Sequence, residues 1–378
     1  MRARRVFFYV QHLLGIGHLA RASRIASALA AKGYDVTVVT GGSPVPGFPA
    51  SDVKHVALPP VLAGDKGFTG LADGEGNPVS EAFKQKRRNL LIEAFLACKP
   101  DIVIFEAFPF GRRQMRFELM PLLEVIEKQD PRPLVAASLR DILQERTKPG
   151  RAEETLDVVR AHFDLVLVHG DPAFARLEET YPYTAEIEDK IVYTGLVAGH
   201  APEPPAERFD VLVSAGGGAV GKELIGAALQ AAGLLASDLK WCLITGPNLP
   251  QDDYEGFAAA APANVQLFRF RKDFASLLSG ARLSVSQAGY NTVCDIFRAG
   301  CASLLIPFVA GGETEQSTRA ARLEKLGLAG VLPEAEVTPE RLARDIEAML
   351  ERPKPDIPPL DLDGAMKTAE ILDRHACA

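Results

Sequence analysis

The chain has 378 residues, of which 47% are hydrophobic and 24% are charged, and its net charge is −7 at pH 7. This composition is that of a globular protein with full cores, and the length predicts two domains. The acidic balance argues against nucleic-acid binding, and the five cysteines form no CxxC pair, which excludes a disulfide framework or a zinc site.

The first half predicts a parallel sheet. A strand over residues 5–10 is followed by a glycine turn at Gly15 and Gly17, a helix that ends at Gly33, and a strand over residues 34–42. This alternation indicates right-handed crossovers between parallel strands. Further strands are expected at residues 53–58, 101–106, 133–139, 164–170 and 190–195. Residues 59–80, rich in Gly, Asp and Pro, predict a long loop.

A Pro-rich linker over residues 197–207 separates this half from a second strand–helix series. Strands are expected there at residues 210–214, 240–246, 264–270, 281–286, 302–308 and 329–332. We therefore expect domains at 1–197 and 208–350, and a tail over 351–378 with a short terminal helix. The carboxyl ends of both sheets would face a cleft.

The stretch from residue 286 to residue 325 carries the strongest pattern. Gly289 follows a strand, and Thr292 and Asp295 fall in the first turns of the next helix, which would face a ligand held at its N-terminus. After a short apolar strand, a second polar loop with Glu315 and Gln316 opens another helix. Two such turns on one sheet edge predict a nucleotide pocket.

This stretch resembles the donor-binding half of the GT-B glycosyltransferases, and it is most similar to family 28, which includes the transferase that adds N-acetylglucosamine to the lipid carrier of peptidoglycan. The resemblance is specific over residues 280–330 and extends to residues 5–45. It implies an α/β fold of two doubly wound Rossmann-like domains facing across a cleft. The N-terminal domain would bind the acceptor and the C-terminal domain the nucleotide sugar. The terminal helix would return toward the N-terminal domain.

The resemblance also implies a donor site. Asp295 stands where the family usually has a Glu that binds the ribose hydroxyls, and Glu315 and Gln316 match the pair that reads the sugar. The glycine loop that carries Ser214, Gly216 and Gly217 would approach the donor diphosphate or the acceptor. Phe270 would lie beside the nucleotide base. For Phe270 the alternative is a strand residue that points into the core. For Glu315 and Gln316 the alternative is an ordinary polar start of a helix. A phosphate-binding P-loop is disfavoured, because Glu223 stands where that motif needs Ser or Thr.

His18 is the candidate general base. Gly15 and Gly17 let the backbone turn and approach a ligand, and a helix N-terminus keeps an imidazole neutral. Family 28 carries a histidine at this place. Glu106, at another strand end, would orient His18 and stabilise its charged form. The alternatives are a helix-capping histidine and a solvated strand-end acid. His12 is a further candidate, with a structural role equally open.

Basic residues cluster in the first half, in a run of Lys84, Lys86, Arg87 and Arg88 and again at Arg112 and Arg113. They indicate either a solvated helix face or a site for a phosphate-bearing acceptor or a membrane surface. A metal-binding DxD pattern occurs only at residues 361–363, inside the Pro-rich tail, so we expect no metal and no cofactor.

Together these observations predict an inverting, metal-independent glycosyltransferase that moves a sugar from a nucleotide-diphosphate donor, with a UDP-sugar favoured, to an acceptor hydroxyl. The alternatives are a UDP-sugar 2-epimerase on the same fold and a non-catalytic nucleotide-sugar binder. No signal peptide or membrane span is visible, which predicts a cytoplasmic protein. The sequence does not identify the acceptor, but an anionic or a membrane-borne acceptor is expected. With a membrane-borne acceptor, the protein would bind peripherally at the inner membrane face.

Overall fold

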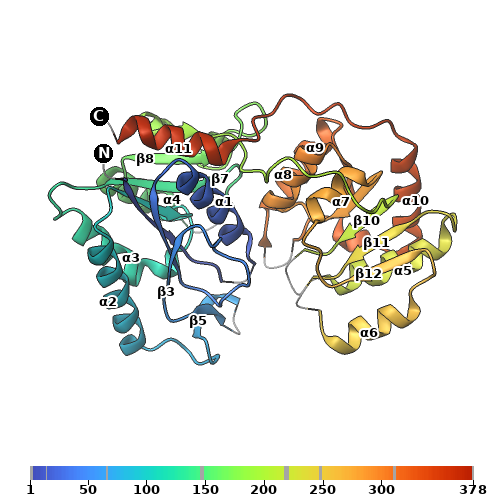
Figure 1. Cartoon of the computed structure of the whole chain (residues 1–378), viewed down its shortest axis with the longest axis horizontal. Coiled ribbons are helices and arrows are strands. Elements are labelled where there is room, and N and C mark those ends of the chain that lie inside the picture. The colour runs from blue at the N-terminus through green and yellow to red at the C-terminus, as the bar shows by residue number, and fades with distance from the viewer. Residues whose placement is uncertain are drawn as a thin grey trace. The chain divides into compact units, whose positions relative to one another are not determined.

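A computed structural model describes residues 3–13, 15–64, 67–144, 149–216, 221–246, 249–309 and 312–376. The chain divides into two compact units, the first made of residues 1–197 with residues 360–378 and the second of residues 198–359. Each is built on a sheet whose paired strands all run parallel (Figure 1). Long runs of buried apolar residues form these strands, as expected where helices cover both faces of a sheet.

The sheet of the first unit has seven strands in the order β3-β2-β1-β6-β7-β8-β9. The order reverses between β1 and β6, which makes this pair the topological switch point, where open α/β sheets bind ligands. The strands are β1 (Arg5–Val10), β2 (Asp35–Thr40), β3 (Lys54–Ala57), β6 (Ile102–Glu106), β7 (Leu134–Arg140), β8 (Leu165–His169) and β9 (Ile191–Tyr193).

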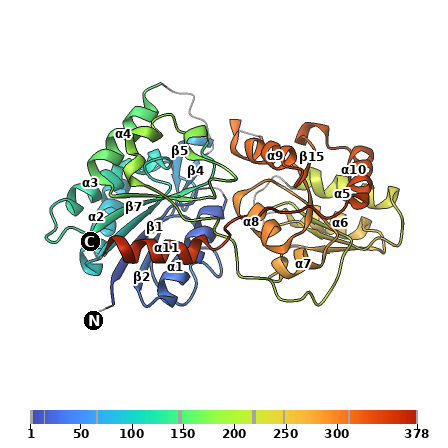
Figure 2. The same cartoon turned by 90° about the horizontal axis from the view of Figure 1, so that it is seen from above.

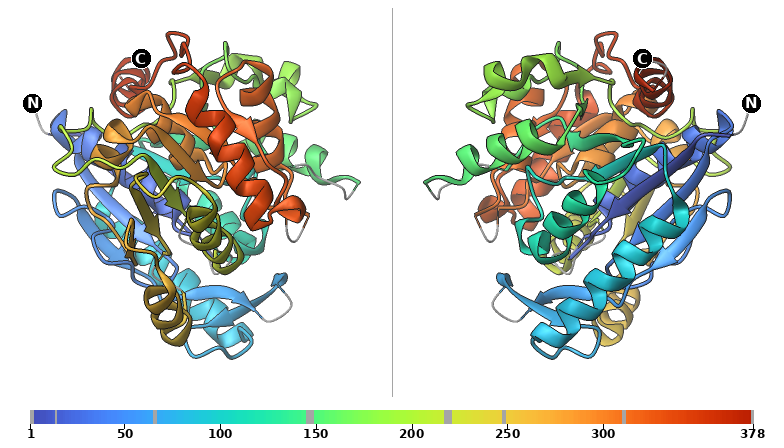
Figure 3. Two further views of the ribbon diagram at one scale, coloured as in Figure 1. Left: turned by 90° about the vertical axis from the view of Figure 1, so that its right-hand side faces the viewer. Right: turned by 90° about the vertical axis from the view of Figure 1, so that its left-hand side faces the viewer.

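Five α-helices of the described chain belong to this unit: α1 (Gly17–Ala31), α2 (Glu81–Cys98), α3 (Arg116–Ile126), α4 (Arg151–His162) and α11 (Gly364–His375). Short 3-10 helices span Arg113–Met115, Leu177–Glu179 and Thr184–Lys190. Helix α1 turns Ile25 and Leu29 fully into the core. Figure 3 looks onto each unit in turn and shows helices around its sheet.

The long loop expected over residues 59–80 is wrong for most of its length. The structure has an antiparallel hairpin there, β4 (Val61–Gly64) paired with β5 (Gly67–Asp73). The Asp73 carboxylate accepts the backbone N–H groups of Glu75 and Asn77, both at 2.9 Å, and so closes a tight turn after β5. The pairing of the two strands orders this segment, although its glycine-rich sequence does not predict regular structure.

Helix α11 packs against α1, and Figure 2 shows the two helices side by side. Asp373 on α11 binds Arg4 and the hydroxyl of Tyr34. Before the helix, the backbone of Asp361 accepts a hydrogen bond from Leu196 N at 2.7 Å, and Lys367 pairs with the Asp361 carboxylate. The aspartates of the DxD pattern thus lie where the returning segment joins the first unit.

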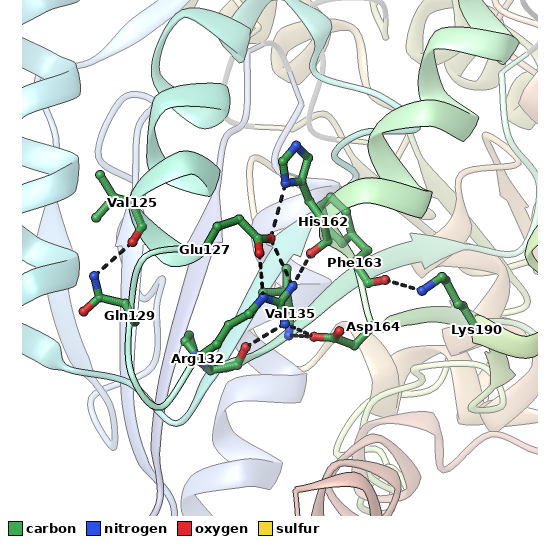
Figure 4. A network of polar contacts seen from close by, with 10 residues as sticks. Val125, Glu127, Gln129, Arg132, Val135, His162, Phe163, Asp164 and Lys190 are labelled. Carbon is green, nitrogen blue, oxygen red and sulfur yellow. Dashed lines mark hydrogen bonds and ion pairs between the residues drawn. The ribbon is translucent and has the colours of Figure 1, made fainter.

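A polar network ties down the other edge of the sheet, where β7 and β8 begin (Figure 4). Arg132 donates to Asp164 at 2.7 Å, to Glu127 at 3.1 Å and to the backbone oxygen of His162 at 2.8 Å. Asp164 also accepts the backbone N–H of Val135 at 2.7 Å. These contacts fix where both strands begin, and therefore the position along the strand axis of the residues at their carboxyl ends.

The sheet of the second unit has six strands in the order β12-β11-β10-β13-β14-β15. This is the 3-2-1-4-5-6 order of a dinucleotide-binding fold, with its switch point between β10 and β13. The strands are β10 (Val211–Ser214), β11 (Trp241–Ile244), β12 (Val265–Phe268), β13 (Leu283–Ser286), β14 (Ala302–Leu305) and β15 (Gly330–Val331).

The helices of the second unit are α5 (Lys222–Leu234), α6 (Gln251–Ala260), α7 (Phe274–Gly280), α8 (Tyr290–Ala299), α9 (Glu315–Lys325) and α10 (Pro339–Glu351), with a 3-10 turn at Glu334–Glu336. Helix α10 packs against α5. Within the described parts of the chain, no helix combines the length and the apolar character that crossing a membrane requires.

Candidate active site

The switch point of the first unit brings a histidine and a carboxylate together. His18 lies in the first turn of α1, directly after β1, and Glu106 is the last residue of β6. His18 Nδ1 is 2.8 Å from Glu106 Oε1. Because β1 and β6 are neighbours, their carboxyl ends place both side chains at one point of the sheet edge.

Glu106 is held as a carboxylate. It is fully buried, and burial alone would raise its pKa. The adjacent charge of Arg21 and the hydrogen bonds from His18 and Ser138 outweigh this and lower the pKa of Glu106 to about 2. Arg21 donates to Oε1 from one turn further along α1, and Ser138 Oγ donates to Oε2 at 2.6 Å. The carboxylate is therefore ionised at neutral pH.

His18 is held neutral. Burial is the largest cause and the charge of Arg112 the second, and together they lower the pKa of His18 to about 3, although Glu106 opposes the shift. An ionised Glu106 can only accept, so Nδ1 carries the hydrogen and Nε2 keeps its lone pair. The side chain remains 17% exposed, and its Nε2 lone pair can accept a proton.

The expected acceptor residues divide between the site and the surface. Arg112 donates from Nε to the backbone oxygen of Gln11 at 2.7 Å, and burial and the nearby charge of Arg140 lower its pKa to about 10. Arg113 instead pairs with Glu154 at the surface. A left-handed backbone at Arg112, with φ of 55°, turns the two neighbours apart.

Both glycines of the turn lie at the mouth of α1. A Cβ built on Gly15 would meet nothing within 4 Å, so the protein itself does not require a glycine there. Gly17 is the first residue of α1, next to His18. His12, the further candidate, is 4% exposed and lies against Gly42, where a Cβ would be only 2.7 Å from His12 Nδ1.

The basic run on α2 is not a uniform solvated face. Arg87 is fully buried, and it donates to Glu118 at 2.6 Å and to Gln11 Oε1 at 2.7 Å. Tyr9 Oη also donates to Glu118, at 2.5 Å. The interpretation of Arg87 as an acceptor contact or surface charge is therefore wrong. Through its bond to Gln11, Arg87 holds the segment that follows β1.

The switch point of the second unit gathers the expected donor residues. Ser214 ends β10, and Gly216 follows with φ of 75°, a backbone that favours glycine. Gly289 directly precedes α8, whose first turn holds Thr292 and whose second turn holds Asp295. Gly217 lies outside the described residues.

Gly289 places no side chain of its own over the N-terminus of α8. It is the N-cap residue and makes no side-chain capping bond, and a Cβ there would meet only Thr292 Oγ1, at 4.0 Å. The first N–H groups of a helix have no partner within the helix and carry a partial positive charge. This end of α8 is suited to an anion such as a diphosphate.

The pair Glu315 and Gln316 is engaged by the protein. Glu315 is 2% exposed and accepts from Arg319 at 2.6 Å, while Arg319 also donates to the backbone oxygen of Ala288 at 2.9 Å. Gln316 Oε1 accepts the backbone N–H of Phe308 at 3.2 Å. In this structure Glu315 therefore braces the loop before α8 and does not present its carboxylate to solvent.

Phe270, two residues beyond β12, is 66% exposed and does not pack into the core. Phe268, at the end of that strand, lies instead under the guanidinium of Arg271, 4.6 Å from its ring centre. An exposed aromatic ring at a strand end suits stacking on a planar ligand.

The described residues contain no group of three His, Cys, Asp or Glu able to hold a metal ion.

Three residues of the first site escaped sequence reasoning. Arg21 lies one helical turn after His18, a spacing that places both on one face of α1. His169 ends the apolar run of β8, the same signal that singled out Glu106. Ser138 lies inside β7, and only the register of that strand with β6 brings it opposite Glu106.

The sequence model of the glycosyltransferase family 28 C-terminal domain matches residues 211–362. The UDP-N-acetylglucosamine–N-acetylmuramyl-(pentapeptide) pyrophosphoryl-undecaprenol N-acetylglucosamine transferase of Thermotoga neapolitana is 26% identical over 181 residues, covering 48% of this chain and 51% of the relative. The transferase of the same name from Rhizobium leguminosarum bv. trifolii is 26% identical over 89% of this chain and 85% of its own length. The chain thus spans about half the length of the first of these relatives.

Solved structures match over the whole length. MurG of Acinetobacter baumannii has a TM-score of 0.58 at 17% identity, covering 97% of this chain and 95% of that one. The calicheamicin glycosyltransferase CalG4 has a TM-score of 0.62 at 17% identity, covering 100% and 95%. The fold is therefore GT-B, with two Rossmann-like domains. Within that class, residues 211–362 match the C-terminal domain of glycosyltransferase family 28, and the chain is similar to MurG-type transferases.

Proposed function

We propose that the protein transfers a sugar from a nucleotide-diphosphate donor, a UDP-sugar, to an acceptor hydroxyl, with His18 as general base. The hydrogen bond between His18 and Glu106 carries this proposal, because it fixes the tautomer that leaves Nε2 able to accept a proton. The names of the relatives, which are UDP-N-acetylglucosamine transferases, support the donor class.

The proposed reaction is a single displacement. His18 Nε2 takes the acceptor proton while the acceptor oxygen bonds to the anomeric carbon. The bond from that carbon to the diphosphate oxygen breaks on the opposite side, and its electron pair leaves with the diphosphate. The anomeric centre is inverted. Glu106 stabilises the imidazolium, and the open N-terminus of α8 stabilises the leaving diphosphate without a metal ion.

The donor would lie on the second unit. Ser214, Gly216 and Gly217 would approach the diphosphate with Gly289 and Thr292, Asp295 would bind the ribose, and Phe270 would lie beside the base. Gln316 would read the sugar. We assign Glu315 a supporting part, because its carboxylate is bound to Arg319 and holds the loop that ends at Gly289.

The acceptor would lie on the first unit, against Gly15 and Gly17. Arg112 offers a cation close to His18 and suits an anionic acceptor, whether free or membrane-borne. Arg113 forms an ion pair with Glu154 and is not part of this proposal.

A donor screen tests the function. Purified protein is incubated with UDP-sugars and with dTDP-sugars, and thermal shift and nucleotide release are followed with and without acceptor hydroxyls, in EDTA. We expect stabilisation by UDP-sugars and acceptor-dependent UDP release that survives chelation. Conversion of the donor sugar without acceptor would indicate the 2-epimerase. Donor binding without turnover for any acceptor would indicate a non-catalytic binder.

A further inference from the structure

The hydrogen bonds of Glu106 continue beyond His18 and Arg21. Ser138 Oγ lies between Glu106 Oε2 at 2.6 Å and His169 Nε2 at 2.9 Å. His169 Nδ1 is 2.8 Å from Thr194 Oγ1. A line of side chains therefore crosses the carboxyl edge of the sheet from α1 over β6, β7 and β8 to the residue after β9. From Glu106 to Thr194, each is fully buried.

Hydrogen counting gives this line a direction. Ser138 has one hydroxyl hydrogen, and an ionised carboxylate at 2.6 Å must receive it. The Ser138 oxygen must then accept from His169, so His169 carries its hydrogen on Nε2. Burial lowers the pKa of His169 to about 3, so its ring is neutral and Nδ1 accepts from Thr194. Every donor in the line points toward Glu106.

The opposite direction is disfavoured by the same geometry. Thr194 Oγ1 is also 2.9 Å from the backbone oxygen of Gly195 and could donate there. His169 would then donate from Nδ1, and Ser138 would give its hydrogen to His169. The oxygens of Ser138 and an ionised Glu106 would then face each other at 2.6 Å without a hydrogen between them, whereas the first direction leaves only the neutral oxygens of Thr194 and Gly195 in that position, at 2.9 Å. The charge of Glu106 thus selects the tautomer of His169.

We propose that Ser138 and His169 are positioning residues for the base, holding Glu106 oriented and ionised so that it fixes His18 in its Nδ1–H form. This inference rests on the proposed function for its kinetic consequences, but the hydrogen positions stand independently of it. A buried serine and histidine on strands that are otherwise apolar need partners, and the partners that they have lead to Glu106.

The kinetic test replaces Ser138 by Ala. Glu106 loses a hydrogen bond to its charged form, so kcat should fall roughly 10-fold to 100-fold, as expected for a bond to a charged group. The KM for donor should not change, and the acidic limb of the pH–rate profile should move to higher pH. The matched control is Ser284→Ala, because Ser284 is also a fully buried strand serine but makes no hydrogen bond from Oγ. An unchanged kcat and pH profile in Ser138→Ala would overturn the proposal.

The second test measures hydrogen positions directly. In protein labelled with ¹⁵N-histidine, the ring nitrogen shifts at pH 7 should report Nδ1–H for His18 and Nε2–H for His169. His169→Leu leaves the Ser138 oxygen without its donor and should lower kcat more than His169→Gln, whose amide can still donate to Ser138. The control is His55→Gln, which removes a comparable contact of His55 Nε2 with Thr40 at 2.7 Å, away from Glu106.

Nδ1–H or a charged ring at His169 in the wild-type protein would refute the proposal even if sugar transfer is found. The expected tautomers in a protein that transfers no sugar would instead reject the proposed function and leave the hydrogen positions standing.

Discussion

At the scale of single residues, His18 is a weak base in the unliganded protein because burial and, after it, the charge of Arg112 lower its pKa. An anionic acceptor bound at Arg112 would neutralise that charge, and the His18 ring would become more basic. Substrate binding and base strength would then be linked through one guanidinium.

Arg112→Gln tests this link. Removal of a nearby positive charge favours the imidazolium, so the pKa of His18 should rise from about 3, and neutral His18 should be lost at a higher pH. We expect the acidic limb of kcat/KM and the ¹⁵N titration of His18 to move upward together. Arg113→Gln is the control, because that neighbour is paired with Glu154. Equal titration curves in both variants would contradict the assignment.

Stability should also depend on pH through His18 and His169, and burial lowers the pKa of His12 in the same direction. The pKa values of His18 and His169 fall from 6.5 to about 3, so the unfolded chain binds more protons between these values and stability is lost as pH falls through this window. Glu106, lowered from 4.5 to about 2, acts in the same direction at lower pH. The slope should reach about 1.4 kcal/mol per pH unit for each histidine.

Calorimetry from pH 7 to pH 4.5 should therefore show a falling transition temperature for the first unit. His169→Gln should lose part of this dependence, and His55→Gln a smaller part, because burial also lowers the pKa of the largely exposed His55. A transition temperature that rises on acidification would refute the depressed pKa values.

The sequence identifies residues whose position along a strand determines their surroundings. His18 and Glu106 each follow an apolar run, and parallel pairing brings such ends together. Arg87 has ordinary polar neighbours in sequence, and only a tertiary contact with Glu118 buries it. Glu315 pairs locally with Arg319 on α9, but the contact that ties this pair to the loop before α8 is the long-range bond from Arg319 to Ala288. Local sequence cannot reveal a partner more than thirty residues away, as Glu118 is from Arg87.

At the scale of elements, buried parallel strands were predictable because continuous apolar runs are rare outside them. The hairpin β4–β5 was not, since its short strands contain glycines and gain order from pairing with each other. The N-terminus of α8 is a different case. Its glycine is not demanded by backbone strain, since Gly289 has φ of −66°, or by space within the protein.

Gly289→Ala should therefore fold with nearly unchanged stability, yet weaken donor binding, because a methyl group would cover the N–H groups offered to the diphosphate. The matched control is Gly300→Ala at the other end of α8. Gly300 has φ of 64°, so its replacement should cost roughly 1 kcal/mol of stability and leave donor affinity intact. Calorimetric titration with UDP checks both variants. Wild-type affinity in Gly289→Ala would remove this helix end from the donor site.

At the scale of the whole molecule, the chain places a switch point in each of two sheets and assigns different chemistry to them. The first gathers a buried ionised carboxylate with a neutral histidine, and the second presents a helix that begins with a glycine N-cap and an exposed aromatic ring. The alternation of strands and helices predicts both sheets. That the last helix packs on the first unit rests on side-chain matches, such as Asp373 with Arg4 and Tyr34, which no local pattern announces.

Deletion of residues 360–378 tests how far the units are independent. Ile371 and Leu372 are buried in the first unit, and each should contribute roughly 1.5–3 kcal/mol to its stability. The thermal transition of the first unit should fall by several degrees or more. Affinity for UDP should stay unchanged, because the expected donor residues lie in the second unit. Asp373→Asn, which removes only a half-exposed ion pair with Arg4, should have a much smaller effect. If the deletion abolishes UDP binding while Asp373→Asn preserves it, the terminal helix supports the donor site as well, and the assignment of donor binding to the second unit alone is wrong.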